Sequence, residues 1–132
     1  MSFHTIPKAM LIIYVTFVVV LSVVPFSTPG TPFNDIHVLS LRLDYLLHAL
    51  VFIPLVPLWR FSWPAHPIWL VVVLGLCLAA AAEGIHYFLP YRSYNINDLL
   101  GNIIGVVLGT VAMVLLVNRL TAHKLFAGNA GD

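Results

Sequence analysis

The chain has 132 residues, of which 61% are hydrophobic and 8% are charged, and its mean hydropathy is +0.99. Soluble domains carry about 25% charged residues, so this chain cannot cover a globular surface with polar groups. The formal net charge of +1 is too small to indicate a nucleic-acid partner. The composition therefore predicts an integral membrane protein. Its length allows about four spanning helices of roughly 20 residues each, in a single domain.

The first predicted span covers residues 9–24, which are rich in Val and Ile and include no charged side chain. Lys8 before an apolar run is also typical of a signal peptide. No small-x-small cleavage site follows Val24, however, so we expect this span to be retained. The next segment, Pro25 to about Leu41, contains the turn-forming sequence Pro29-Gly30-Thr31-Pro32. We expect it to lie across the membrane surface as a lid or a short interfacial helix.

The second predicted span covers residues 43–59 and begins with two polar residues on one helical face. Asp44 and His48 are four residues apart, which places them one turn apart on that face. Pro54 and Pro57 lie in the second half of the span and predict a kink there, which a membrane tolerates when neighbours satisfy the freed carbonyls. The span leads into an interfacial belt of aromatic and basic residues, Trp59, Arg60 and Trp63.

The third predicted span covers residues 67–87 and has small residues followed by polar ones near its end. Ala79–Ala82 form a patch that allows another helix to approach closely. Glu83 and His86 follow at a spacing of three, on nearly the same face. This span therefore offers a packing surface next to a carboxylate and an imidazole.

The fourth predicted span covers residues 98–117 and begins with Asp98 and Asn102, four residues apart. Three small residues at the same spacing form a helix-packing ladder, Gly101, Gly105 and Gly109. The ladder can pack within one bundle or between the protomers of a homo-oligomer. The tail, residues 118–132, ends in a segment of Gly, Ala and Asn, and we expect it to be disordered.

Basic residues near the span ends predict the orientation of the chain in the membrane. Four of them lie on one side, Lys8, Arg60, Arg119 and Lys124, and two lie on the other, Arg42 and Arg92. The positive-inside rule then predicts an all-α integral membrane four-helix bundle with both termini in the cytoplasm. In this topology the polar residues converge at the extracytoplasmic end, where they form a candidate ligand-binding site. They are Asp44, His48, Glu83, His86, Arg92, Asp98 and Asn102.

Glu83 is central to this site, because it lies about 6 Å below the predicted interface at 1.5 Å per residue. An unpaired, ionised carboxylate at that depth would cost several kcal/mol, so Glu83 must be protonated or paired. Arg92 is its best predicted partner, with His48 second. Two interpretations stay open, a structural Glu83–Arg92 clamp on the third loop and a site that faces a ligand. Asp98 is also placed to cap the fourth span, and Asn102 to form a hydrogen bond across helices.

Several kinds of chemistry fit this set of side chains. Arg92 can present a bidentate fork to a phosphate, and the same site would also suit a sugar or a carboxylate. Asp44 and His48, with Glu83 and His86, resemble the two-His, two-carboxylate sets that hold zinc or iron. Carboxylate-bridged bundles use more acids than this, so we predict no metal and no cofactor.

The pattern resembles the VanZ-like family of small bacterial membrane proteins. The resemblance rests on three motifs, which are Asp44-x-x-x-His48, Glu83-x-x-His86-x-Phe88-x-Pro90-x-Arg92 and Asp98-x-x-x-Asn102-x-x-Gly105. The family usually has Gln where this chain has His86, and a Lys commonly follows the first Asp, where this chain has Tyr45. The family takes its name from an accessory factor of glycopeptide (teicoplanin) resistance. The resemblance therefore implies a multi-pass protein of the bacterial cytoplasmic membrane with a role in the cell envelope.

Our leading hypothesis from the sequence is a site that binds or handles a cell-wall or lipid-linked precursor. The expected partners are membrane lipids, including a lipid-linked phosphate or sugar. An intramembrane hydrolase or transferase that acts on a phospho- or glycolipid is an alternative, with His48 or Glu83 as general base. A non-catalytic assembly or regulatory protein is another, in which the polar residues only hold the third loop.

Overall fold

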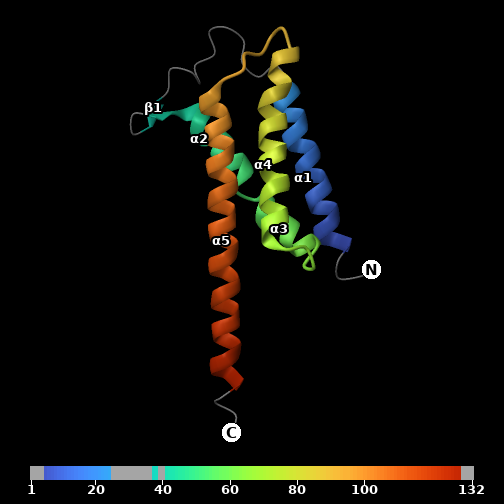
Figure 1. Cartoon of the computed structure of the whole chain (residues 1–132), viewed down its shortest axis with the longest axis vertical. Coiled ribbons are helices and arrows are strands. Elements are labelled where there is room, and N and C mark those ends of the chain that lie inside the picture. The colour runs from blue at the N-terminus through green and yellow to red at the C-terminus, as the bar shows by residue number, and fades with distance from the viewer. Residues whose placement is uncertain (1–4, 25–36, 39–40, 129–132) are drawn as a thin grey trace.

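The computed structural model describes residues 5–24, 37–38 and 41–128, with side chains for 5–24 and 43–121 (Figure 1). The predicted lid, Pro25 to about Leu41, lies almost entirely outside these residues. The described elements are α1 (Thr5–Val23), β1 (His37–Val38), β2 (Leu41–Arg42), α2 (Leu43–Phe52), α3 (Leu55–Ser62), α4 (Ile68–Gly84), the 3₁₀ helix η2 (Ile85–Phe88) and α5 (Ile96–Gly128). β1 and β2 form a short antiparallel pair with His37 opposite Arg42.

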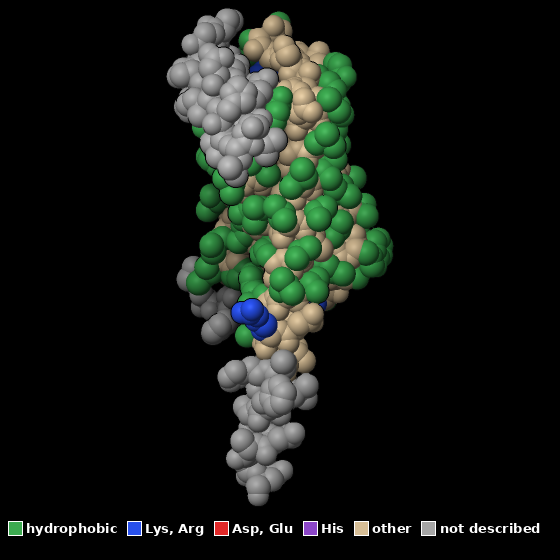
Figure 2. All heavy atoms as spheres, turned by 90° about the vertical axis from the view of Figure 1, so that its left-hand side faces the viewer, with side chains coloured by type: hydrophobic (Ala, Val, Ile, Leu, Met, Phe, Trp, Pro, Cys, Tyr) green, Lys and Arg blue, Asp and Glu red, His purple; other side chains and the backbone are tan. Residues whose placement is uncertain are grey.

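The fold is the all-α bundle that the sequence predicts. In the part of the chain that the structure describes, four helical segments are long and apolar enough to cross a membrane, namely Thr5–Val23, Leu43–Ser62, Ile68–Phe88 and Ile96–Thr121. Hydrophobic side chains cover the helical part of the face shown in Figure 2. Such a surface requires lipid as its solvent, so the protein is a multi-pass membrane protein.

The second span is broken between α2 and α3, as its prolines predict. Ile53 and Pro54 form a turn between the two helices, because proline has no N–H and its ring clashes with the preceding helical turn. Pro57 lies in the first turn of α3. N–H groups in a first turn have no partner within the helix, so proline loses no helical hydrogen bond there. The Tyr14 hydroxyl of α1 donates a hydrogen bond to the Val51 carbonyl oxygen beside the break.

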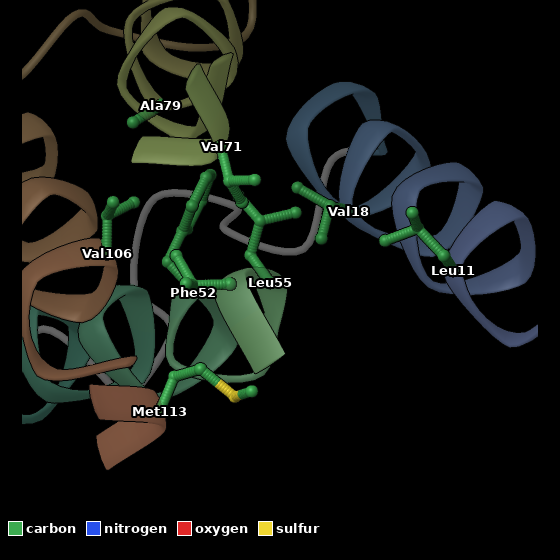
Figure 3. Close-up of a cluster of buried hydrophobic side chains, with 9 residues drawn as sticks. Leu11, Val18, Phe52, Leu55, Val71, Ala79, Val106 and Met113 are labelled. Atoms are coloured by element: carbon green, nitrogen blue, oxygen red, sulfur yellow. The ribbon is translucent and has the colours of Figure 1, made fainter. Parts of the chain in front are cut away.

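The break lets one span contact both sides of the bundle. α2 packs chiefly against α5, whereas α3 packs chiefly against α1 and also contacts α4 and α5. Phe52 and Leu55, on either side of the break, lie in the centre of the core, between Val18 of α1, Val71 of α4 and Val106 of α5 (Figure 3). All five side chains are buried.

The glycine ladder of α5 faces α2 within the same chain. A β-carbon placed on Gly101 would lie 2.9 Å from the carbonyl oxygen of Tyr45. On Gly105 and Gly109 it would collide with the carbonyl oxygens of Ala49 and Ile53, respectively. The backbones of α2 and α5 therefore approach closely because these positions lack a side chain.

The prediction of a disordered tail is wrong for residues 118–128, which continue α5 as a helix up to Gly128. The stretch Asn118–Ala127 contains neither proline nor glycine, and its Leu, Ala, Lys and Arg residues favour a helix. The last four residues lie outside the described part of the chain.

Candidate functional site

All seven predicted site residues lie at one end of the bundle, where α1 ends and α5 begins (Figure 1). We call this the site end. Six of the seven, all except Asp44, form two groups there, and Tyr91 joins the first of them. The first group, the α1 clamp, consists of Glu83, His86, Tyr91 and Arg92 and contacts the last turn of α1. The second, the α2–α5 group, consists of His48, Asp98 and Asn102.

Side chains of the α1 clamp satisfy the free carbonyls at the C-terminus of α1. The last four carbonyls of a helix have no partner within the helix, and each one left unsatisfied in lipid costs several kcal/mol. Arg92 donates through Nη2 to the carbonyl oxygens of Leu21 (3.1 Å) and Val24. The Tyr91 hydroxyl donates to the carbonyl oxygen of Val23 at 3.0 Å. The clamp thus replaces the water that would otherwise solvate this helix end.

His86 completes the clamp and connects it to Glu83. Its Nε2 lies 3.0 Å from the carbonyl oxygen of Ser22, and its Nδ1 lies 3.1 Å from Oε1 of Glu83. A carbonyl oxygen can only accept, so Nε2 carries a hydrogen. A second proton must then lie between Nδ1 and Oε1, since two lone pairs would repel each other there. The pair is electrically neutral overall whichever atom holds that proton, which suits the full burial of Glu83.

The predicted pairing of Glu83 with Arg92 or His48 is therefore wrong. Oε1 of Glu83 accepts the Asn95 N–H at 2.8 Å in addition to its contact with His86. Oε2 is buried and has no hydrogen-bond partner among the described residues. Arg92 is directed to α1 because the uncapped carbonyls are strong acceptors, whereas Glu83 is already neutralised by the neighbouring imidazole.

The ionisable side chains of the α2–α5 group are more exposed than Glu83 and His86 of the α1 clamp, whose side chains are 1% and 5% exposed. His48 of α2 places Nδ1 3.0 Å from Oδ1 of Asn102, and its Nε2 lies 3.8 Å from Oδ2 of Asp98. The amide of Asn102 is buried, whereas the side chains of His48 and Asp98 are 30% and 14% exposed. Because Oδ1 of Asn102 is an acceptor, Nδ1 of His48 carries a hydrogen. The other ring nitrogen, Nε2, lies beside the Asp98 carboxylate. Asp44 lies in the first turn of the same helix, where its Oδ1 accepts the Tyr45 N–H at 3.1 Å.

Asn95 connects the two groups, and the sequence analysis missed its role. Its N–H binds Glu83, its carbonyl accepts the N–H groups of Asp98 and Leu99, and its Oδ1 accepts the Asn97 N–H at 3.0 Å. Asn95 is therefore the N-cap of α5, and the prediction that Asp98 caps this helix is wrong. Asp98 lies in the first turn instead, where the helix dipole favours a carboxylate. An Asn just before an amphipathic segment was the available clue.

The residues of the hypothetical zinc or iron site are not gathered in one place. Glu83 and His86 belong to the α1 clamp, whereas His48 faces Asp98 and Asn102. In the part of the chain that the structure describes, no group of three or more His, Cys, Asp or Glu residues could hold a metal ion.

The fold and the site define a class of protein, a small multi-pass helical membrane protein with a network of buried and half-buried ionisable side chains at one end of its bundle. Residues 9–117 match the VanZ/LLP1 family, and the chain belongs to this family. The resemblance seen in the sequence motifs is thereby confirmed. Neither the curated proteins nor the solved structures include a match to the chain.

Proposed function

We propose that this protein binds the polar headgroup of a lipid-linked cell-envelope precursor, and that the α2–α5 group is the headgroup site. The observation that carries the proposal is the geometry of His48. The buried Asn102 holds its imidazole in place, while the side chains of His48 and Asp98 stay partly exposed at the end of a membrane-spanning bundle. Such a site is preorganised and still accessible.

The surroundings of the group suit a ligand with a lipid tail. Leu47 and Leu50 on α2, with Leu100 and Ile104 on α5, are exposed apolar side chains next to the polar residues. A lipid chain can lie along this surface while its headgroup reaches the polar residues at the helix ends.

The chemistry of the group favours the hydroxyl groups of a sugar over a phosphate. Carboxylate oxygens and a basic imidazole nitrogen accept hydrogen bonds, which hydroxyl groups donate. The guanidinium of Arg92, the residue expected to bind an anion, donates to carbonyls of α1 instead. We therefore place sugar recognition at His48 and Asp98 and give Arg92 a supporting role.

Native mass spectrometry of protein gently extracted from its own membrane tests the proposal. We expect an adduct with the mass of a lipid-linked sugar on the wild type, and its loss from His48→Gln and Asp98→Asn. Tyr91→Phe is the matched control, because it removes a hydroxyl from the α1 clamp and leaves the α2–α5 group intact. A bare wild-type protein, or an adduct that persists in both site variants, contradicts the proposal. The first of these outcomes favours a non-catalytic assembly role.

The orientation of His48 also supports a second candidate function, that of a hydrolase or transferase acting on the same lipid. An imidazole whose Nδ1–H is held by an amide oxygen presents Nε2 as a general base. Incubation of the purified protein with the lipid identified above would show a product by mass. Turnover that is unchanged in His48→Gln would exclude this residue as the base.

A further inference from the structure

The end of the bundle opposite the site end carries a cluster of basic and aromatic side chains. Lys8 comes from α1, Trp59 and Arg60 come from α3, and Trp63 and His66 come from the connection between α3 and α4. Lys8 Nζ lies 5.6 Å from the centre of the Trp63 ring. We call these five residues the basic–aromatic cluster.

His66 organises this cluster through three contacts. The Trp59 indole donates its Nε1–H to Nδ1 of His66 at 3.2 Å, and Arg60 donates through Nη1 to the His66 carbonyl oxygen at 3.2 Å. The His66 ring stacks on Trp63 with 5.9 Å between ring centres and 9° between planes. These contacts hold the guanidinium and both indoles in a defined arrangement, and a guanidinium has five N–H donors. Among the described residues Arg60 has no other hydrogen-bond partner, which leaves most of its donors for a ligand.

The described acidic residues are confined to one end of the bundle. The described acids, Asp44, Glu83 and Asp98, all lie toward the site end. Among the described residues, neither Lys8 nor Arg60 has an ion-pair partner, because the pairs found there join histidines to acids. The side chains of Lys8 and Arg60 are both half-buried. The opposite end thus presents fixed positive charge that no carboxylate of the described chain neutralises.

The surrounding membrane suggests which groups bind the positive charges of Lys8 and Arg60. Tryptophan rings prefer the depth of the lipid headgroups, so Trp59 and Trp63 place Lys8 and Arg60 beside the lipid phosphates. Guanidinium groups bind phosphate oxygens in a bidentate manner, and basic pockets between spanning helices bind anionic headgroups. We propose that the basic–aromatic cluster is a binding site for the phosphate headgroup of an anionic phospholipid. This proposal is independent of the sugar site at the other end.

The tryptophans allow a direct test of this proposal. The chain has three of them, Trp59, Trp63 and Trp69, and all lie in or next to the cluster. The full-length protein would be reconstituted in phosphatidylcholine vesicles that contain equal mole fractions of brominated phosphatidylglycerol or brominated phosphatidylcholine, with bromine near the headgroup end of the acyl chains. Bromine quenches nearby indoles, so the ratio of the two quenching curves gives the relative affinity for the anionic lipid.

We expect stronger quenching by brominated phosphatidylglycerol for the wild type. Lys8→Gln and Arg60→Gln should each lower the relative affinity about fivefold, the equivalent of one basic residue near an anionic membrane surface. A Gln at position 60 can still donate to the His66 carbonyl oxygen, so the loop keeps its contact. Arg60→Lys retains the charge and should retain most of the preference. Arg119→Gln is the matched control, because it removes a charge from α5 outside the cluster.

Three results would overturn the proposal. The first is equal quenching of the wild type by both brominated lipids. The second is a preference that survives in the Lys8→Gln/Arg60→Gln double variant. The third is an equal loss in Arg119→Gln, which would mean that net charge attracts the lipid diffusely, with no defined site.

Discussion

His86 donates its Nε2–H to the carbonyl oxygen of Ser22 at 3.0 Å, although 64 residues separate them in the sequence. The bond joins η2 to the last turn of α1 in the membrane. Together with Tyr91 and Arg92, it attaches the motif from Glu83 to Arg92 to the end of the first span. The predicted ligand-binding role of Glu83, His86 and Arg92 stays a prediction, and the function proposed above places ligand binding at His48 and Asp98.

Replacement of His86 by Leu should strongly destabilise the protein. The change leaves the Ser22 carbonyl and the buried Glu83 carboxyl group without their partner. Breaking one side of a buried pair costs about 3–5 kcal/mol. His86→Gln should cost much less, because one amide nitrogen can donate a hydrogen to each of the two oxygens. Thermal unfolding in detergent compares the variants, and equal losses would show that the ring itself matters, rather than its donors.

Replacement of Arg92 by Met should loosen the end of α1. The two carbonyls that Nη2 contacts lose a charged donor, and hydrogen bonds to charged groups contribute about 1.5–3 kcal/mol. Hydrogen exchange in bicelles should therefore rise for the backbone amides of the last turn of α1 and stay unchanged in α5. Arg92→Lys keeps a charged donor and should show a smaller increase. Uniform exchange throughout the chain would instead indicate global destabilisation.

Replacement of Gly105 by Ala should separate α2 from α5. The new methyl group would collide with the carbonyl oxygen of Ala49 and would lie 2.7 Å from Cβ of Phe52. Neither atom can move without shifting the backbone, so the expected cost is about 1–3 kcal/mol. Gly84→Ala is the matched control, because no atom lies within 4 Å of the new methyl group. That change should be neutral or stabilising by about 0.5–1 kcal/mol. Unfolding midpoints measure both effects, and similar losses in the two variants would contradict the close approach of α2 and α5.

Removal of the Tyr14 hydroxyl should lower the stability of the protein most while the second span is broken. Tyr14 donates to the Val51 carbonyl oxygen, which a continuous helix would satisfy with the Leu55 N–H. We expect Tyr14→Phe to cost about 0.5–1.5 kcal/mol, the usual net value of one hydrogen bond. In a Pro54→Ala/Pro57→Ala background, which removes both prolines from the span and allows the helix to continue, the cost should be smaller. A double-mutant cycle measures this coupling, and strictly additive effects would mean that the hydroxyl does not compensate for the break.

Much of the architecture could be predicted from composition and spacing. The four spans follow from apolar runs, because lipid demands an apolar surface and internally satisfied backbone groups. The break at Pro54 follows from the chemistry of proline. The gathering of Asp44, His48, Glu83 and Asp98 at one end follows from the alternation of spans. The helical end of α5 was not predicted, because the Gly and Asn residues that end the tail disfavour a helix, whereas the residues before them favour one.

The partners of these residues could not be predicted in the same way. Helical spacing places Glu83 and His86 on one face, but it does not reveal that the carbonyls of α1 lie opposite them. Every residue has a backbone carbonyl, so no residue type in the sequence marks these carbonyls as the acceptors for Arg92. Asn95 likewise donates a hydrogen bond to Glu83 through its backbone N–H. Nearly every residue carries this donor, so the sequence does not mark it.

The sequence by itself determined that the chain spans the membrane and that its polar side chains meet at one end. Hydrophobicity and helical periodicity, which are local properties, are sufficient for both. Only the tertiary structure decided that Arg92 caps α1, that His86 contacts both Glu83 and α1, and that His48 and Asp98 stay partly exposed. These assignments depend on which groups come within hydrogen-bonding distance of each side chain, and that is fixed by the packing of helices distant in the sequence.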